Sequence, residues 1–377
     1  MLVCMVDSIH VARWLGHFTD QEVDFYLFPS GPNRRVHPQI SDLVNNSSVS
    51  LATFSIPPWA RYLTLPLWLA DRILSDRLRG WMLRRKIRQM NPDYLHALEL
   101  QHAGYIAERA LRDKRITVPL IATNYGSDIF WFQKYPKHLQ RIRELLKRTN
   151  FYSAECHRDY LLAAKYGFAG VDLPLAPNAG AISDTDLERN KLSSSSRKII
   201  AVKGYQEWVG RAQVVIQALK LRKDDLKEAE IVFFSCGVSM LLKIQFLKLT
   251  SGLNVKGIRK HHFNHDQILD LFSRSRVYVG VSLSDGLSTS SIEAMSMGAF
   301  PIQSDTSCAS EWFLDGVSGQ SFNGFSPAQV GEVLVNWFHS EELLESARIL
   351  NLEIVSRKFS EILELEHFKT FYGLKTK

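Results

Sequence analysis

Residues 277–322 read VYVGVSLSDGLSTSSIEAMSMGAFPIQSDTSCASEWFLDGVSGQSF. The stretch opens with an apolar run, Val277–Leu283, which predicts a buried parallel strand. After a polar turn, Ser288–Met297 has the composition of a helix, ended by Gly298 at the position of a C-terminal cap. Ala299–Gln303 predicts the next strand. The sequence therefore predicts a βαβ unit, and the ligands of such units gather at the carboxyl ends of the strands.

Two acidic residues flank the start of the predicted helix. Asp285 precedes the helix and Glu293 is expected in its first turn, eight positions later. A helix start offers free backbone N–H groups and a positive dipole end, which together suit a phosphate. A purely structural alternative exists for one of the acids, because Ser290 and Glu293 have the spacing of a capping box.

The run Asp285–Ile302 (DGLSTSSIEAMSMGAFPI) is similar to the acidic-x7-acidic signature of retaining GT-B glycosyltransferases, the "glycosyl transferases group 1" family (family 4). That family usually has Glu as the first acid, where this chain has Asp285. The segment Glu311–Gly319 (EWFLDGVSG) also resembles the family, which often carries an acid and a D-G-x-x-G turn at this distance. The resemblance implies an α/β chain of two doubly wound, Rossmann-like domains that face a central cleft.

Strands and helices also alternate through the rest of the 377 residues, a length that favours two domains with parallel sheets. The serine-rich, aperiodic segment 181–197 reads as a linker. We therefore expect an acceptor-side domain over 1–180 and a nucleotide-sugar-binding domain over 198–355. A C-terminal helix over 356–377 is expected to pack back on the first domain.

The composition is that of a globular protein, with 45% hydrophobic and 23% charged residues. No apolar run is long enough for a spanning helix, and an N-terminal strand that meets Asp7 at once predicts no signal peptide. The four cysteines are scattered without a C-x-x-C pair, so we expect free thiols and no metal site. These features predict a cytoplasmic protein.

Much of the net charge of +7 comes from the segment between Arg61 and Arg88, which contains eight basic residues and two acidic ones. At 100° per residue, one helical face would carry Arg77, Trp81, Arg84 and Arg88. Such a face suits an anionic membrane surface, which would make the protein peripheral on the inner face of the membrane. A solvated helix face whose Trp covers the core is the alternative. Nucleic acid is not expected, because no reader module accompanies the charge.

The segment Lys198–Ala212 (KIIAVKGYQEWVGRA) resembles the family's loop that clamps the donor diphosphate with two cations. Lys203 and Arg211 are the basic residues of this loop. Two such cations would stabilise the leaving diphosphate without metal, so no cofactor is expected beyond the nucleotide-sugar donor. The alternative is ordinary surface charge, although a cation at a helix start opposes the helix dipole.

The resemblance also implies roles for the acidic pair. Asp285 is expected to face the sugar hydroxyls, and Glu293 the nucleotide ribose, whose two adjacent hydroxyls can both donate to one carboxylate. The predicted phosphate cradle consists of four backbone amides, those of Gly286, Leu287, Ser288 and Thr289.

The amino-terminal half resembles the family at Pro119–Ile129 and at residues 176–180, with two departures. Tyr125 stands where the family often has His, and the glycine pair after the first strand is replaced by D-S-I-H. His10 is the candidate titratable group of that first loop, with a helix-start hydrogen bond as the alternative. Asp128 is a candidate for sugar or acceptor contact, with an Asx turn as the alternative.

Together these features predict a retaining glycosyltransferase of hexosyltransferase type. It would move a sugar from a nucleotide diphosphate to a glycan or lipid-linked acceptor in polysaccharide or lipopolysaccharide biosynthesis. Two alternatives stay open: a GT-B nucleotide-sugar epimerase, which needs no acceptor, and a non-catalytic protein that binds a nucleotide sugar.

Overall fold

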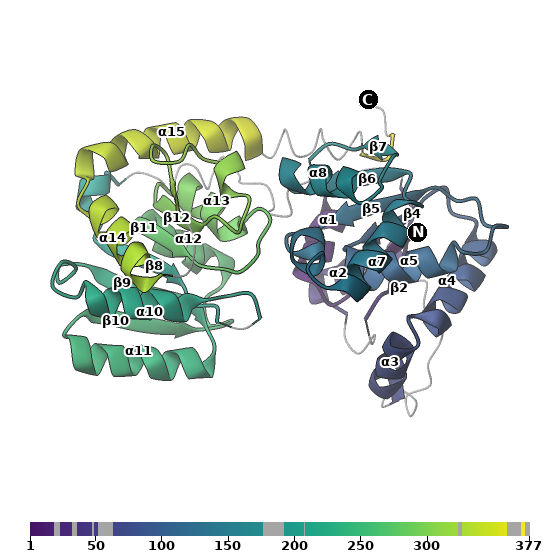
Figure 1. The fold of residues 1–377 in the computed structure, drawn as a ribbon, viewed down its shortest axis with the longest axis horizontal. Helices are drawn as coiled ribbons and strands as arrows, with labels where there is room; N and C mark the ends of the chain where they lie inside the picture. The colour runs from purple at the N-terminus through teal and green to yellow at the C-terminus, as the bar shows by residue number, and fades with distance from the viewer. Residues whose placement is uncertain are drawn as a thin grey trace. The chain divides into compact units, whose positions relative to one another are not determined.

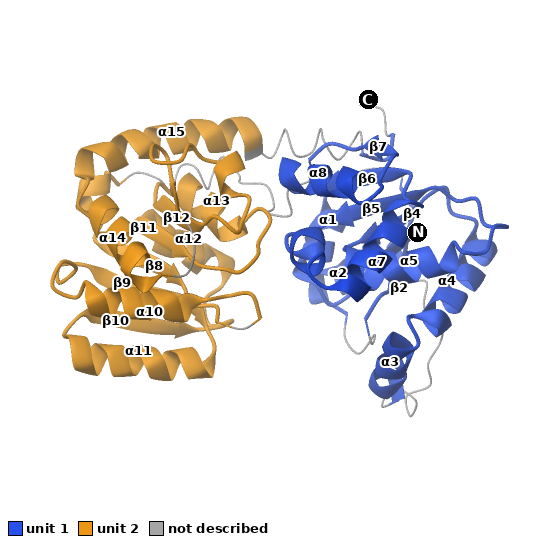
Figure 2. Cartoon of the chain, viewed as in Figure 1, with its two compact units in different colours: residues 1–178, 365–377 blue, residues 179–364 orange. Residues whose placement is uncertain are grey.

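The computed structural model describes residues 1–18, 23–31, 36–46, 49–51, 63–175, 192–206, 208–322, 326–359 and 371–373. The chain forms two compact units, residues 1–178 with 365–377 and residues 179–364 (Figure 2). Each unit is built around its own parallel sheet (Figure 1). The expected α/β class is confirmed in both units.

Unit 1 holds a seven-stranded sheet of order β3-β2-β1-β4-β5-β6-β7. All of its strand pairs are parallel, as alternation with helices predicts. Its strands are β1 (Leu2–Cys4), β2 (Phe25–Pro29), β3 (Val49–Leu51), β4 (Leu95–Leu98), β5 (Leu120–Asn124), β6 (Phe151–Ala154) and β7 (Val171–Asp172). Its helices are α1 (Ile9–Gly16), α2 (Pro38–Asn46), α3 (Thr64–Ile73), α4 (Arg77–Met90), the π-helix η2 (Leu100–Gly104), α5 (Tyr105–Ala110), α6 (Asp128–Phe132), α7 (Pro136–Leu146) and α8 (His157–Lys165).

Unit 2 holds a six-stranded parallel sheet of order β10-β9-β8-β11-β12-β13. Its strands are β8 (Ile199–Lys203), β9 (Glu230–Cys236), β10 (Asn254–Arg259), β11 (Ser275–Gly280), β12 (Phe300–Ser304) and β13 (Gln320–Phe322). Its helices are α10 (Ala212–Leu221), α11 (Val238–Ser251), α12 (His265–Ser273), α13 (Thr289–Ser296), α14 (Pro327–Phe338) and α15 (Glu341–Phe359), with short 3₁₀ turns at Ser194–Ser196 and Ala309–Glu311.

Both sheets are covered on their two faces, which explains why their strands are nearly continuous apolar runs. In unit 2, α10, α11 and α14 contribute to one core cluster, whereas α12 and α13 contribute to the other. In unit 1, α5 and α7 belong to one cluster, and α1 and α2 to the other. Phe371 also lies in this last cluster, so the described residues near the C-terminus pack in unit 1.

The structure corrects several sequence-based expectations. The polar composition of residues 30–55 predicts loops, but this segment contains α2 and β3. Two edge strands, β10 and β13, were not predicted, because their polar and glycine residues interrupt any apolar run. The sequence pattern of residues 101–112 predicts a single helix, but this segment begins as the π-helix η2 and continues as α5. Three predicted segments lie outside the described residues. They are most of the linker (181–191), the family-like segment 176–180 and most of the expected C-terminal helix.

One buried arginine ties the start of unit 2 to its sheet. Arg197 is only 1% exposed, and its guanidinium donates to the carbonyls of Met297 (2.8 Å) and Leu192 (2.6 Å). Burial and the charge of Arg348 lower the pKa of Arg197 to about 10.

We expect Arg197→Met to lower the free energy of unfolding by about 2–3 kcal/mol, because it leaves buried carbonyls without a donor. Thermal unfolding checks this, with Lys198→Met as the control, since Lys198 is the exposed neighbour. Equal melting temperatures for the two variants would contradict the assigned role.

Candidate active site

The strand order of unit 2 reverses between β8 and β11. From β8 the chain runs outward through β9 to β10, then returns to β11 on the other side of β8 and continues to β12 and β13 (Figure 1). In open parallel sheets, ligands bind outside the carboxyl ends of the strands at such a reversal. Lys203 is the last residue of β8, and Asp285 lies in the loop after β11. The sequence-predicted residues therefore come together at this point.

The two loops that leave β8 and β11 are hydrogen-bonded to each other. The amide of Arg211 donates to Val281 O (2.9 Å), and the amide of Leu283 donates to Val209 O (2.7 Å). Gly210 and Ser282 form an antiparallel bridge between these contacts. The loop of the expected diphosphate clamp and the loop of the first acid are thus one continuous piece of structure.

Lys203 is partly buried at the end of β8. Burial alone would lower its pKa, but the nearby acidic groups of Tyr278, Asp285 and Glu293 outweigh burial and raise the pKa above its ordinary value. No hydrogen bond or ion pair joins its Nζ to any residue that the structure describes. The ammonium therefore stays charged at neutral pH and keeps its donors available for an anionic ligand.

Arg211 occupies the residue before α10. Its Nη1 donates to the carbonyls of Trp208 (2.8 Å) and Gly210 (2.6 Å), both in the loop that follows β8. The guanidinium thus shapes its own loop with one nitrogen, and its other N–H groups make no bond to a described residue. Gly210 cannot carry a side chain here, because a Cβ would lie 2.2 Å from Tyr205 O.

The loop after β11 leads directly into α13. The amide of Gly286 already donates to Asp285 Oδ1 (3.0 Å), and Gly286 O accepts from the Cys308 amide (3.1 Å). The amides of Leu287, Ser288 and Thr289 donate to no residue that the structure describes. Three of the four amides expected in the phosphate cradle are therefore open at the positive end of this helix.

Glu293 is the fifth residue of α13, one turn later than the sequence predicts, and is 8% exposed. The capping-box alternative is wrong: the N-cap is Ser288, which makes no side-chain cap bond, and Ser290 lies inside the helix. Glu293 Oε1 is instead 2.9 Å from His265 Nε2, at the start of α12.

His265 is a residue that the sequence reasoning missed. It follows Asn264, which caps α12 in a full capping box with Gln267. The run HHFNH (261–265) after an unrecognised strand, β10, was the available signal. His265 lies beside Glu293 because α12 and α13 cover the same face of the sheet.

Residues 184–349 match the family model described as "Glycosyl transferases group 1". The match covers most of unit 2 and none of unit 1. The match contains Lys203, Arg211, Asp285 and Glu293, the four residues that the resemblance singled out. No curated protein matches the chain.

Solved structures similar to the whole chain share its GT-B fold. Anabaena Alr3699/HepE, crystallised with UDP and glucose, has a TM-score of 0.68 at 12% identity, with 99% of each chain covered. A glycosyltransferase from Rickettsia africae has a TM-score of 0.66 at 13% identity, covering 99% of this chain and 98% of that one. Sucrose-phosphate synthase from Thermosynechococcus elongatus has a TM-score of 0.69 at 12% identity, covering 98% and 97%.

In the first unit of this GT-B chain, His10 and Asp128 each follow a strand at the carboxyl edge of the sheet. His10 is exposed, and its backbone amide donates to Ser8 Oγ (3.2 Å), the N-cap bond of α1, which does not involve the imidazole. Asp128 is buried, and its Oδ2 accepts from the amides of Leu100 (2.8 Å) and Tyr125 (3.1 Å). The second bond comes from an amide three residues earlier in the chain, so it is not the Asx turn of the alternative, whose donor lies two residues later.

Burial raises the pKa of Asp128, and the neighbouring charge of Glu99 raises it further. Glu99 follows β4 with a φ of +79°, and its carboxylate accepts from the amides of His102 (2.7 Å) and Ala103 (2.5 Å). Glu99 lies in no motif that marks it in the sequence. Acids that bind backbone amides in this way organise the loops at the strand ends.

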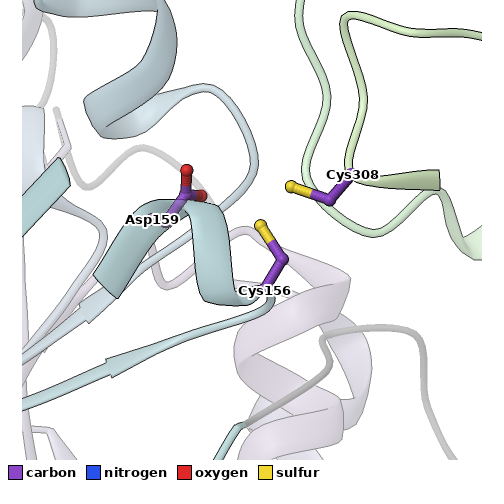
Figure 3. A group of neighbouring side chains, drawn as sticks. All are labelled: Cys156, Asp159 and Cys308. Atoms are coloured by element: carbon purple, nitrogen blue, oxygen red, sulfur yellow. The ribbon is translucent and has the colours of Figure 1, made fainter. Parts of the chain in front are cut away.

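The cysteines occupy both units. Cys4 and Cys236 are free and buried, which confirms the thiol prediction for these two. Cys156 lies just before α8, whose first turn holds Asp159, and Cys308 lies in the loop after β12 (Figure 3).

Proposed function

We propose that this chain is a retaining glycosyltransferase that moves a hexose from a nucleotide diphosphate donor, with UDP as the nucleotide, to a glycan or lipid-linked acceptor. The observation that carries the proposal is the position of Lys203 at the strand-order reversal, with its ammonium uncommitted. The family match over unit 2 supports the reaction class. The UDP and glucose of a structural neighbour support the choice of donor.

The reaction breaks the bond between sugar C1 and the diphosphate oxygen and forms a bond between C1 and an acceptor hydroxyl oxygen. The diphosphate leaves with the electron pair of the broken bond, and the acceptor hydroxyl passes its proton to an oxygen of the departing diphosphate. Negative charge on the diphosphate therefore grows in the transition state. Lys203 and the free N–H groups of Arg211 would stabilise this charge without metal or cofactor, with the α13 amides as further donors.

The two acids would position the donor. Asp285 accepts hydrogen bonds from sugar hydroxyls, and Glu293 accepts from the ribose diol while His265 holds its other side. In unit 1, Asp128 would organise the loops that receive the acceptor, and His10 would contact it. We place the reaction in the cytoplasm, as a step of polysaccharide or lipopolysaccharide assembly.

A thermal-shift series with UDP, ADP, GDP and uridine tests the donor site. A ligand at 100 times its dissociation constant stabilises by about 2.7 kcal/mol, so the UDP shift should be several degrees and should exceed the other three. Incubation with UDP-hexoses and glycan acceptors should then give a product with the anomeric configuration of the donor. An inverted product would contradict retention.

The same reactions separate the remaining alternatives. Formation of an epimeric UDP-sugar without acceptor would replace the transferase by an epimerase. Tight UDP binding with no turnover of any UDP-sugar would make the chain a binding protein.

We expect Glu293→Gln to weaken UDP binding by roughly tenfold or more, because a hydrogen bond to a charged group contributes about 1.5–3 kcal/mol. The melting temperature should change little, since Glu293 does not cap α13 and its His265 partner is half exposed. Calorimetric titration with UDP checks the affinity. A lower melting temperature with unchanged affinity would contradict the ribose role.

A further inference from the structure

Helix α3 presents an apolar face to the outside and its charges to the inside. Its sequence, TLPLWLADRI, contains two charged residues, Asp71 and Arg72. Asp71 is 2% exposed, whereas Ile73 is 84% exposed. The exposed side chains of the helix and of the residue after it are all apolar: Pro66, Leu67, Leu69, Ala70, Ile73 and Leu74. A surface helix of a globular protein has the opposite arrangement.

The inward charges hold this orientation firmly. Asp71 accepts from the Leu78 amide (2.7 Å) and from Arg79 Nε (2.7 Å). Arg79 also pairs with the fully buried Asp76, which Arg141 contacts at 2.6 Å. Arg72 donates to Gln101 O (3.0 Å). Because these buried groups depend on one another, turning α3 over would leave charges unpaired, at a cost that keeps the apolar face outside.

The apolar surface continues onto α4, where exposed cations border it. Leu78 and Trp81 are exposed, and so are Arg77 and Arg85, which form no ion pair with a described residue. In Figure 1, α3 projects from the body of unit 1 beyond α4. The apolar side chains thus lie on a projecting element with positive charge beside them.

The unpaired positive charge between Arg77 and Arg88 is smaller than the sequence suggests. Arg88 pairs with Asp113 (2.6 Å), and Arg84 lies 3.6 Å from the same carboxylate. Two of the three arginines on the face Arg77, Trp81, Arg84 and Arg88 therefore share one counter-charge, which Arg115 also contacts. Charge attraction through Arg77–Arg88 alone would be modest, so the apolar face of α3 has to contribute most of any membrane affinity.

We propose that α3 inserts its apolar face into the boundary between headgroups and acyl chains of an anionic membrane, with Arg77 and Arg85 on the lipid phosphates. At 10 residues the helix is about 15 Å long, half the thickness of a bilayer core, so it lies in the interface and does not cross. No helix among the described residues is long and apolar enough to span a membrane. Trp81, with an apolar body and one N–H, suits the same interfacial depth.

Membrane binding by α3 is a property separate from the proposed glycosyl transfer and does not depend on it. Vesicle binding needs neither donor nor acceptor, so it succeeds or fails separately from UDP binding.

The test is flotation of the full chain with vesicles of phosphatidylcholine, with and without phosphatidylglycerol, at low and high salt. Wild type should float with the anionic vesicles and keep part of its binding at high salt, because apolar insertion is not screened. Leu67→Ser and Ile73→Ser should each weaken binding by roughly tenfold at both salt concentrations. Arg77→Glu with Arg85→Glu should remove most of the preference for anionic lipid, since each cation contributes about fivefold.

Matched controls come from α11 in unit 2, which also exposes large apolar side chains. Leu242→Ser and Leu249→Ser remove comparable exposed area there and should leave flotation unchanged. The proposal is overturned if wild type fails to float, or if the α11 variants lose binding while the α3 variants keep it. It is also overturned if α3 instead mediates a soluble dimer that Ile73→Ser dissociates.

Discussion

Lys203→Met should reduce turnover of the UDP-sugar by about 10²–10³-fold, the usual effect of removing one preorganised donor from a developing negative charge. The side chain stands at the end of β8, where neighbouring acids raise its pKa and hold it charged. Methionine keeps the apolar stem and removes the charge. Folding should be little affected, because no bond joins Nζ to a described residue.

Lys248→Met is the matched control, since Lys248 is an exposed residue of α11, away from the strand-order reversal. It should keep wild-type turnover. Arg211→Ala should also lower turnover strongly, but it additionally frees the Trp208 and Gly210 carbonyls and so loosens the loop. Wild-type rates in both Lys203→Met and Arg211→Ala would show that the clamp assignment is wrong.

Asp285→Asn should lower turnover by roughly 100-fold while changing UDP affinity less than threefold, because the lost interactions are with the sugar and strengthen in the transition state. This pattern differs from that of Glu293→Gln, which acts on nucleotide affinity. Steady-state rates together with UDP titrations separate the two acids.

Asp270→Asn serves as its control, because Asp270 lies on the surface of α12 and pairs only with Arg274 among the described residues. It should behave as wild type. Equal losses of turnover and UDP affinity in Asp285→Asn would place Asp285 at the diphosphate and not at the sugar.

The positions of the candidate residues in unit 2 could be predicted because these residues lie close in the sequence to the apolar runs of two buried strands. The apolar runs that become β8 and β11 are buried on both faces, so each ends at a recognisable loop. Lys203 is the last residue of β8, and Asp285 lies in the loop after β11. Because β8 and β11 pair in parallel, their carboxyl ends lie side by side, and this pairing brings Lys203 and the loop of Asp285 together.

Contacts between distant segments could not be predicted in the same way. The partner of Glu293 is His265, 28 residues away on a helix whose preceding strand, β10, has no apolar run. Local spacing instead suggested a capping box, because Ser290 and Glu293 are three residues apart. The true helix start at Thr289 is set by the loop from β11, which tertiary packing fixes.

The local sequence pattern was also insufficient to predict the surface charge of α4 and the polarity of α3. The helical face Arg77, Trp81, Arg84 and Arg88 was correct in geometry, since α4 covers all four residues. Its charge was overestimated because Asp113, in the turn after α5, pairs with two of its arginines. The inverted polarity of α3 depends on where Asp71 and Arg72 find partners, and those partners are visible only in the folded unit.

The most direct test of the donor site compares the affinities of UDP and uridine, by calorimetry, in wild type and in Lys203→Met. If the diphosphate binds at the strand-order reversal, wild type should bind UDP at least 100-fold more tightly than uridine, by the strength of charge-assisted bonds to phosphate. Lys203→Met should lose most of that difference and keep its affinity for uridine. An undiminished preference for UDP in the variant would contradict the account.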